Sequence, residues 1–258
     1  MGNYINLGNA AFTLSRNSEY VDKSGLISVV NSTINTENFF SLVTRPRRFG
    51  KTMAAEMLCA YYDWSCDSRA LFDDLVIASD PCYERHLNKY PVIYLDISDF
   101  VTEIKDATIV RQIQQALKED IHQEYPEVPL KEGESLMIYL TRVVAFIGQK
   151  LIFIIDEWDG ILREFEGNKS VVNGYVNWLR RLFKSGQTAK VFAGAYITGI
   201  LPIKKYDTQS ALNNFWEYSM VEPMNMAPYF GFTVDEVQNL AEKYGMDYRE
   251  LEKWYDGY

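Results

Sequence analysis

The chain has 258 residues, 47% hydrophobic and 24% charged, which is typical of a folded globular protein and excludes a largely disordered one. Its formal net charge of −9 argues against binding nucleic acid through the overall field, so no nucleic-acid partner is expected. The chain opens without a basic and apolar leader, and no apolar run is long enough to cross a bilayer, which predicts a cytoplasmic protein without a membrane partner.

Continuous apolar runs predict the strands, because strands covered by helices on both faces lack polar alternation. The predicted strands are 39–44, 91–98, 151–156, 191–198 and, more weakly, 215–222. Helical patterns lie between or after them, at 50–63, 106–124, 134–149, 171–185 and 233–245. Strands that alternate with helices predict an open α/β sheet with helices on both faces.

Three regions are predicted along the chain. They are an N-terminal lead-in segment at 1–38, a core at 39–225 and a C-terminal helical region at 226–258. In the last region Thr233 is placed as an N-cap and Glu236 follows three residues later, which predicts a capping box. The chain closes on WYDGY without a polar tail, which we interpret as an end before a further domain.

The first functional motif is RPRRFGKT, residues 45–52. Its last three letters end the phosphate-binding pattern G-x-x-x-x-G-K-[ST], but Arg45 stands where the pattern has its first glycine. A predicted strand precedes the motif and a predicted helix follows it, so backbone N–H groups at the helix start would face a phosphate. The predicted nucleotide-binding residues are Arg45, Pro46, Arg47, Arg48, Phe49, Gly50, Lys51, Thr52 and Met53.

Roles within this motif follow from side-chain chemistry. Lys51 would reach the β- and γ-phosphates, and the Thr52 hydroxyl would bind Mg²⁺. Pro46 stiffens the entrance of the loop, and Arg47 or Arg48 would donate forked hydrogen bonds to phosphate. A basic turn in solvent is the alternative interpretation of these two arginines.

Two further strand ends carry polar side chains. LIFIIDEWDG delivers Asp156 and Glu157 to the sheet edge, where Asp156 would hold Mg²⁺ through water and Glu157 would orient or deprotonate the attacking water. VFAGAYIT ends in Thr198, which would contact the γ-phosphate or the water. Ordinary strand ends are the alternative for each. No arginine finger is assigned, since 180–181 look like a solvated helix face and the signal at 204–205 is weak.

These motifs, with YVDKSGLI, IIDEWDGILRE and ITGILPIKK, resemble the bacterial AAA-ATPase-like family from Tyr20 to Tyr258. The resemblance implies a P-loop ATPase of the AAA+/STAND-related kind, often followed by a PD-(D/E)xK nuclease-like domain. It implies a modified Walker A motif at 45–52, a Walker B motif at 152–157 and a sensor-like segment at 197–199. Nothing in the chain resembles the nuclease core, so nuclease activity is not expected of it.

With this resemblance, the expected fold class is an α/β P-loop NTPase three-layer sandwich. Its mainly parallel sheet has the order 5-1-4-3-2, and a small C-terminal helical region follows. The expected function is Mg²⁺-dependent ATP binding and hydrolysis, with Lys51, Glu157 and Thr198 as catalytic residues and Thr52 and Asp156 as metal ligands. The activity would serve as a switch or motor for an effector domain or protein, or within an assembly of copies of the chain.

Three points are less determined. The choice of adenine over guanine rests on the resemblance, and the segment 20–26 is expected near the base. A P-loop phosphotransferase would share Lys51, Thr52 and Asp156. The alternative function that is not enzymatic is a nucleotide-gated interaction module, which would bind ATP with little turnover.

Overall fold

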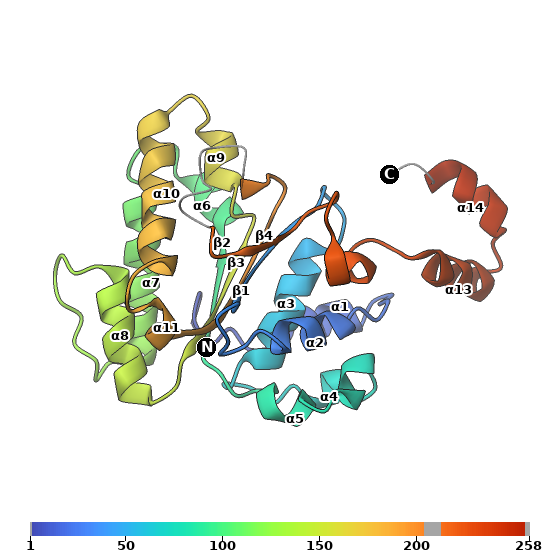
Figure 1. Ribbon diagram of the computed structural model, residues 1–258, viewed down its shortest axis with the longest axis horizontal. Coiled ribbons are helices and arrows are strands. Elements are labelled where there is room, and N and C mark those ends of the chain that lie inside the picture. The colour runs from blue at the N-terminus through green and yellow to red at the C-terminus, as the bar shows by residue number, and fades with distance from the viewer. Residues whose placement is uncertain (1, 204–212, 256–258) are drawn as a thin grey trace.

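A five-stranded sheet forms the centre of the computed structural model, which describes residues 2–203 and 213–255 (Figure 1). All strand pairs are parallel, in the order β2-β3-β4-β1-β5. Read from the β5 edge, this is the order 5-1-4-3-2 expected from the sequence, although the strand ends differ in detail. The strands are β1 (Phe40–Thr44), β2 (Val92–Asp96), β3 (Leu151–Asp156), β4 (Phe192–Gly199) and β5 (Trp216–Tyr218).

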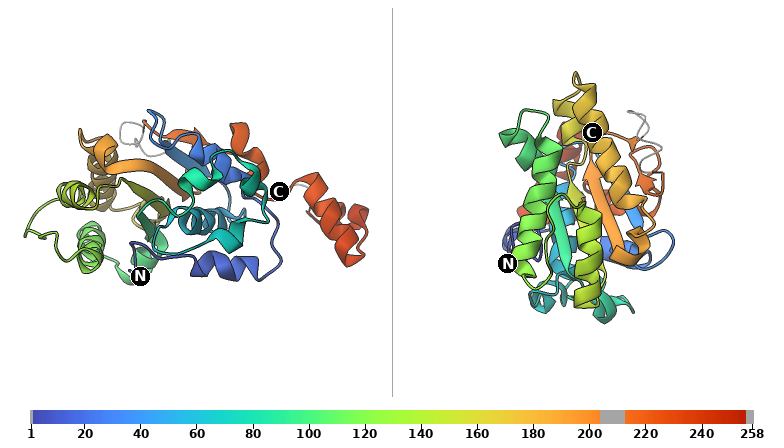
Figure 2. Two further views of the ribbon diagram at one scale, coloured as in Figure 1. Left: turned by 90° about the horizontal axis from the view of Figure 1, so that it is seen from below. Right: turned by 90° about the vertical axis from the view of Figure 1, so that its left-hand side faces the viewer.

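Helices cover both faces of this sheet (Figures 1 and 2). One face carries α1 (Ala10–Arg16), α2 (Gly25–Asn31), α3 (Lys51–Tyr62), α4 (Arg69–Phe72), the 3₁₀ turn η1 (Val76–Ser79) and α5 (Tyr83–His86). The other carries α6 (Ile97–Glu103), α7 (Ile109–Glu124), α8 (Leu136–Ile147), α9 (Gly160–Glu164), α10 (Lys169–Phe183) and α11 (Thr188–Val191). The chain therefore forms three layers, with helices above and below the strands.

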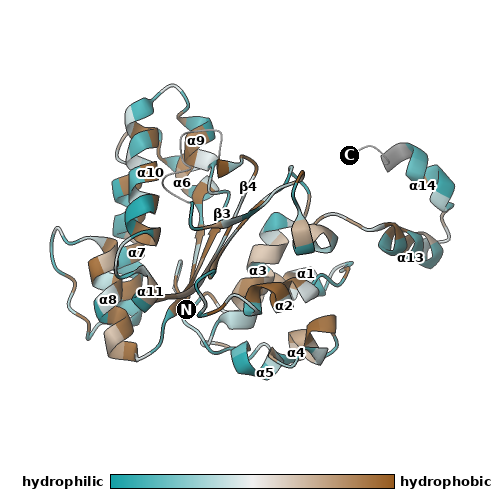
Figure 3. Cartoon of the chain, viewed as in Figure 1, coloured by the Kyte–Doolittle hydropathy of each residue, from teal (hydrophilic) through white to brown (hydrophobic). Residues whose placement is uncertain are grey.

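Burial on β3 shows why the strands read as continuous apolar runs. All six of its residues are buried, and the five apolar ones alternate between two separate hydrophobic cores. Phe153 and Ile155 pack under α7, α8 and α10, whereas Ile152 and Ile154 pack under α3. In Figure 3 the strands are correspondingly apolar, and the outer faces of α7 and α10 are polar. A strand with both faces covered therefore reads as a nearly continuous apolar run, and in β3 the polar Asp156 occurs only at the carboxyl end.

The N-terminal segment packs on the body of the fold. Its backbone N–H groups at Asn3, Tyr4 and Ile5 donate to the Asp120 carboxylate of α7. Ile5 also forms an antiparallel bridge to Ile93, so this segment covers the outer edge of β2. Covering an edge strand removes a row of unpaired backbone groups from solvent.

The C-terminal region follows η3 (Met224–Tyr229) with α13 (Val234–Tyr244) and α14 (Tyr248–Tyr255). These two helices project away from the sheet and are largely polar (Figures 1 and 3). The capping box predicted at Thr233 and Glu236 is confirmed, because each side chain accepts the other residue's backbone N–H. Two ion pairs tie α13 to the N-terminal segment, Lys23–Glu236 at 2.6 Å and Lys243–Glu19 at 2.8 Å. None of the helices in the described part of the chain combines the length and the apolar character that a membrane span requires.

Candidate functional site

The loop between β1 and α3 turns at two residues with left-handed backbone. Arg48 has φ 69° and Gly50 has φ 79°, and Gly50 is the N-cap of α3. No side chain among the described residues caps this helix, so its first N–H groups are left for another acceptor. Together with the helix dipole, these donors favour an anion at the start of α3.

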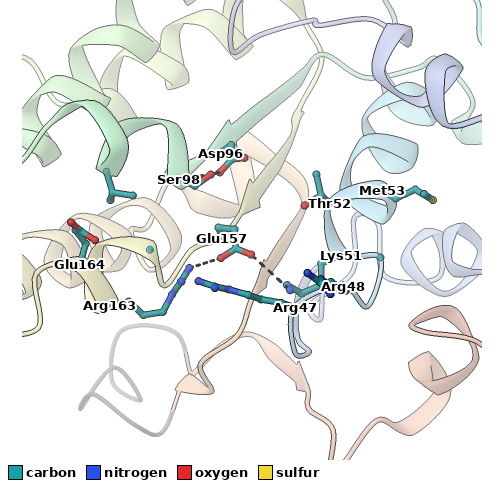
Figure 4. A pocket seen from close by; sticks show the side chains of 13 residues that line it. Arg47, Arg48, Lys51, Thr52, Met53, Asp96, Ser98, Glu157, Arg163 and Glu164 are labelled. Atoms are coloured by element: carbon teal, nitrogen blue, oxygen red, sulfur yellow. Dashed lines mark hydrogen bonds and ion pairs between the residues drawn. The ribbon is translucent and has the colours of Figure 1, made fainter. Parts of the chain in front are cut away.

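A cavity of about 570 Å³ opens at this helix start, beside the carboxyl ends of β2 and β3 (Figure 4). Gly50, Lys51 and Thr52 form one side of it. The positively charged side chains that line it are Arg47, Arg48, Lys51 and Arg163. The carboxylates that line it are Asp96, Glu157 and Glu164. An excess of positive charge at this point, in a chain whose net charge is −9, is suited to an anionic ligand.

Glu157 lies between two cations in this cavity (Figure 4). Its Oε1 is 3.8 Å from the Lys51 ammonium, and its Oε2 accepts a hydrogen bond from Arg163 Nη2. Lys51 also donates to the carbonyl of Pro46 at 3.1 Å. Lys51 and Glu157, which lie 106 positions apart in the printed sequence, are thus brought together as the motifs predict. In this structure the Lys51 ammonium and the Glu157 carboxylate form an ion pair with each other.

Asp156 and Thr198 end neighbouring strands and are fully buried behind this cavity. The Thr198 hydroxyl donates to Asp156 Oδ1, which also accepts the backbone N–H of Glu157 at 3.0 Å. Asp156 Oδ2 has no hydrogen-bond partner within residues 2–203 and 213–255. Thr198 therefore contacts Asp156 and does not line the cavity. A buried carboxylate oxygen without a partner is costly unless a further group satisfies it.

Arg45 lies apart from the other predicted phosphate-binding residues. Its side chain is buried and donates from Nη1 to the carbonyls of Thr44 (2.8 Å) and Tyr218 (2.7 Å). The guanidinium also lies over the Phe230 ring, with 5.2 Å between them, and burial lowers the pKa of Arg45. Arg45 thus joins the end of β1 to β5, and its side chain does not line the cavity.

A second cavity of about 210 Å³ adjoins the first and shares Arg48, Gly50 and Met53 with it. Met53 points away from Glu157 in Figure 4, and Phe49 lines the second cavity but not the first. Tyr20, Val21 and Lys23 line it from the N-terminal segment that was expected near a base. Tyr229, Phe232 and Leu240 line it from the C-terminal region. The second cavity is thus more apolar and lies between the two ends of the chain.

Five polar residues near the site were not singled out from the sequence. Asp96 lines the first cavity from the end of β2 and Ser98 from the start of α6, whereas Asp159, Arg163 and Glu164 follow Glu157. Asp96 pairs in register with Asp156, and burial raises the pKa of its carboxyl, as does the nearby Asp156 charge. The end of the predicted strand 91–98 was a usable signal for Asp96. A usable signal for Arg163 was its place four residues after Asp159, which is the i,i+4 spacing of a helical ion pair.

The remaining basic residues considered from the sequence contribute less. Arg180 and Arg181 lie on α10 and line a different cavity, between α7, α8 and α10. Positions 204 and 205 lie outside the described residues.

Together the fold and the site define an α/β protein with an all-parallel sheet and an anion-suited cavity at the carboxyl ends of its strands. Residues 9–209 match the AAA-ATPase-like family, whose description is "Predicted AAA-ATPase", and the chain belongs to this family. Among solved structures the chain is similar to "Structure of C. elegans PCH-2", at 12% identity and a TM-score of 0.34. That match covers 92% of this chain and 46% of the other, a likeness too distant to carry an argument. No curated protein matches the sequence.

Proposed function

We propose that this chain is a P-loop ATPase that binds ATP with Mg²⁺ and hydrolyses it to ADP and phosphate. One observation carries the proposal. Lys51, Thr52 and Glu157 converge on one cavity at the uncapped start of α3, and Asp156 lies directly behind Glu157. Phosphate binding, metal binding and activation of water each have a suitable group there.

The phosphates would lie in the first cavity, where the Lys51 ammonium would leave the Glu157 carboxylate and bind them instead. Arg47 and Arg48 are exposed on the same loop, and Arg47 points across the cavity in Figure 4. Guanidinium groups bind phosphate oxygens through paired hydrogen bonds, which compensates for a loop with one glycine fewer than the usual pattern. Gly50 allows the close approach of the backbone, since its φ of 79° is left-handed.

The donor set fits Mg²⁺, which prefers oxygen ligands and is held by few protein groups beside phosphate and water. Thr52 offers a hydroxyl at the cavity, and Asp156 offers the buried Oδ2 that lacks a partner among the described residues. When bound, the ion would neutralise charge on the phosphates. Thr198 would contribute indirectly, because its hydroxyl fixes the orientation of Asp156.

Hydrolysis would depend on Glu157. Its carboxylate would hold a water molecule against the γ-phosphorus and accept the proton that the water loses. The water oxygen forms the new bond to phosphorus while the bond to the β–γ bridging oxygen breaks, which gives ADP and phosphate. Glu157 is suited to this role because it follows directly after β3 at the cavity wall and its side chain is only 19% exposed.

The nucleoside would occupy the second cavity, which continues from the first at Arg48, Gly50 and Met53. Its walls come from the N-terminal segment and from the C-terminal region at Tyr229, Phe232 and Leu240. A bound nucleotide would therefore touch the core, proposed as 39–225, and the helical region, proposed as 226–258. Contact with both is the physical basis on which nucleotide state would act as a switch for an effector.

Binding is the first test. Calorimetric titration with ATP, ADP and GTP in the presence of Mg²⁺ should show ATP binding that Lys51→Ala weakens by about tenfold to hundredfold, the value of a charged hydrogen bond. Lys190→Ala is the matched control, because Lys190 is exposed and lies on α11 before the amino end of β4. Equal ATP affinity in wild type and Lys51→Ala would refute the phosphate site.

Turnover is the second test. Wild type should release phosphate from ATP, and Glu157→Gln should abolish the release while it retains ATP binding. Binding without any release in wild type would instead identify a nucleotide-gated interaction module. Asp96 gives the phosphotransferase alternative a specific basis, because its carboxylate lines the cavity where an acceptor hydroxyl would lie. Phosphate release that falls when an acceptor is added, with a phosphorylated acceptor as product, would favour that reaction.

A further inference from the structure

Arg163 of α9 binds two carboxylates at once. Its Nη2 donates to Glu157, and its Nε lies 3.0 Å from Asp159 Oδ2. The Arg163 side chain is 29% exposed and lines the cavity, whereas Asp159 is fully buried. One guanidinium thus joins an acid at the cavity wall to an acid in the interior.

Asp159 is itself fixed by the chain that follows β4. Its two carboxylate oxygens accept the backbone N–H groups of Ile200 (3.2 Å) and Leu201 (3.1 Å). The adjacent Trp158 is fully buried, and its backbone N–H donates to the carbonyl of Thr198 at 2.9 Å. Asp159 therefore fixes the position of Arg163 relative to the end of the sheet, and Arg163 in turn fixes the position of the Glu157 carboxylate.

Glu157 requires such an anchor because of its backbone and its neighbours. Its φ of 50° is left-handed, which is costly for a residue with a side chain and persists only where the surroundings impose it. Lys51 competes for the same carboxylate at 3.8 Å. Once Lys51 turns to the phosphates, Arg163 is the cation that remains on Glu157 in the described cavity.

We infer that Arg163 is a positioning residue for Glu157: it holds the carboxylate at the cavity wall, clear of Lys51, so that Lys51 binds phosphate and Glu157 binds water. This inference rests on the proposed ATPase function. Without Arg163, Glu157 is drawn to Lys51, and one contact neutralises both the phosphate-binding group and the proton acceptor. Arginine suits the position because its planar fork spans two carboxylates, which an ammonium group does not.

The test is steady-state ATP turnover of the full chain carrying Arg163→Ala, Arg163→Gln or Arg163→Lys. Removing a charged hydrogen bond to the reacting group should lower kcat by about tenfold to hundredfold, and KM for ATP should rise because Glu157 then competes with phosphate for Lys51. Arg163→Gln keeps much of the side-chain bulk, so it guards against loss of folding, and Arg163→Lys should recover part of kcat. Arg69→Ala is the control. It breaks an exposed ion pair between Arg69 of α4 and Glu84 of α5, outside the cavity, and should leave kcat and KM unchanged.

A double variant separates action through Glu157 from direct action on the nucleotide. In a Glu157→Gln background, which retains ATP binding and in which the neutral Gln no longer competes for Lys51, Arg163→Ala should leave the ATP affinity unchanged. A loss of ATP affinity in that background, or a raised KM with unchanged kcat in the single variant, would show that Arg163 binds the nucleotide itself and would overturn the inference. Wild-type kcat in Arg163→Ala or Arg163→Gln would overturn it while the ATPase function stands. Absence of Glu157-dependent turnover in wild type would overturn the ATPase function, and the inference with it.

Discussion

Gly199, at the end of β4, offers a test of how tightly the site is packed. A Cβ at this position would lie 2.4 Å from Trp158 Cδ1, 2.5 Å from Asp159 Oδ1 and 2.7 Å from Trp158 Nε1. These distances are far inside ordinary contact. Neither neighbour has room to yield, because both side chains are fully buried. Gly199→Ala should therefore displace Trp158 and Asp159 together.

The cost follows from two contributions. Overpacking a close-packed interior costs about 1–3 kcal/mol. Displacement of Asp159 also weakens the hydrogen bonds from Ile200 and Leu201, each with a net value of about 0.5–1.5 kcal/mol. We expect Gly199→Ala to lower the free energy of unfolding by about 3 kcal/mol, and the midpoint of thermal unfolding by about 6–12 °C. Since Asp159 holds Arg163, kcat should fall too.

Urea and thermal denaturation measure the first effect, and phosphate release measures the second. Gly174→Ala is the matched control: Gly174 is an exposed residue in α10 with no heavy atom within 4 Å of an added Cβ. That variant should be unchanged or stabilised by up to about 1 kcal/mol, because alanine favours a helix interior over glycine. If Gly199→Ala behaves like Gly174→Ala, the packing around Asp159 is looser than the structure indicates and the anchoring of Arg163 fails with it.

Two further predictions concern buried polar groups outside the cavity. Arg45→Met should lower the free energy of unfolding by about 1–3 kcal/mol in urea, because the Tyr218 carbonyl loses its charged donor; a loss of ATP affinity like that of Lys51→Ala at unchanged stability would instead make Arg45 a phosphate ligand. His86 is buried with Nδ1 2.9 Å from the Tyr90 hydroxyl, and burial lowers its pKa. The unfolded chain therefore binds the proton more readily, so the His86 contribution to stability should fall as pH drops below about 6.5. Subtracting the unfolding free energies of His86→Gln from those of wild type between pH 7.5 and 5.5 should isolate this slope, and a flat difference would contradict it.

The sequence predicted the sheet well because its inner strands, β1, β3 and β4, are buried on both faces. Leu151–Asp156 and Phe192–Gly199 have no exposed position, so each reads as an unbroken apolar run whatever lies beside it. Lys51 and Glu157 were also predictable, because the carboxyl ends of parallel strands meet at one sheet edge. Burial of a strand on both faces shows directly in the apolar residues of that strand, so it can be predicted from the local sequence.

Partnerships between side chains distant in sequence were not predictable in this way. Arg45 was assigned to phosphate by its place in the motif, but its side chain is buried and donates from Nη1 to the Tyr218 carbonyl of β5. Arg163 lies in the motif IIDEWDGILRE only four residues after Asp159, but the sequence does not show that Asp159 is held by the backbone after β4, 41 positions away. Such choices among several nearby acceptors are decided by packing, which a local pattern does not contain.

The backbone of RPRRFGKT shows how the loop turns without the first glycine of the usual pattern. The Arg45 N–H donates to the Gly199 carbonyl at 3.1 Å, so position 45 still extends the β1–β4 ladder and needs no left-handed backbone. The turn occurs later, at Arg48 (φ 69°) and Gly50 (φ 79°). Strain at Arg48 costs about 1–2 kcal/mol and places this residue where both cavities meet. Arg45 therefore holds β5, Arg47 faces the first cavity, and Arg48 borders both, which assigns each loop arginine a separate physical task.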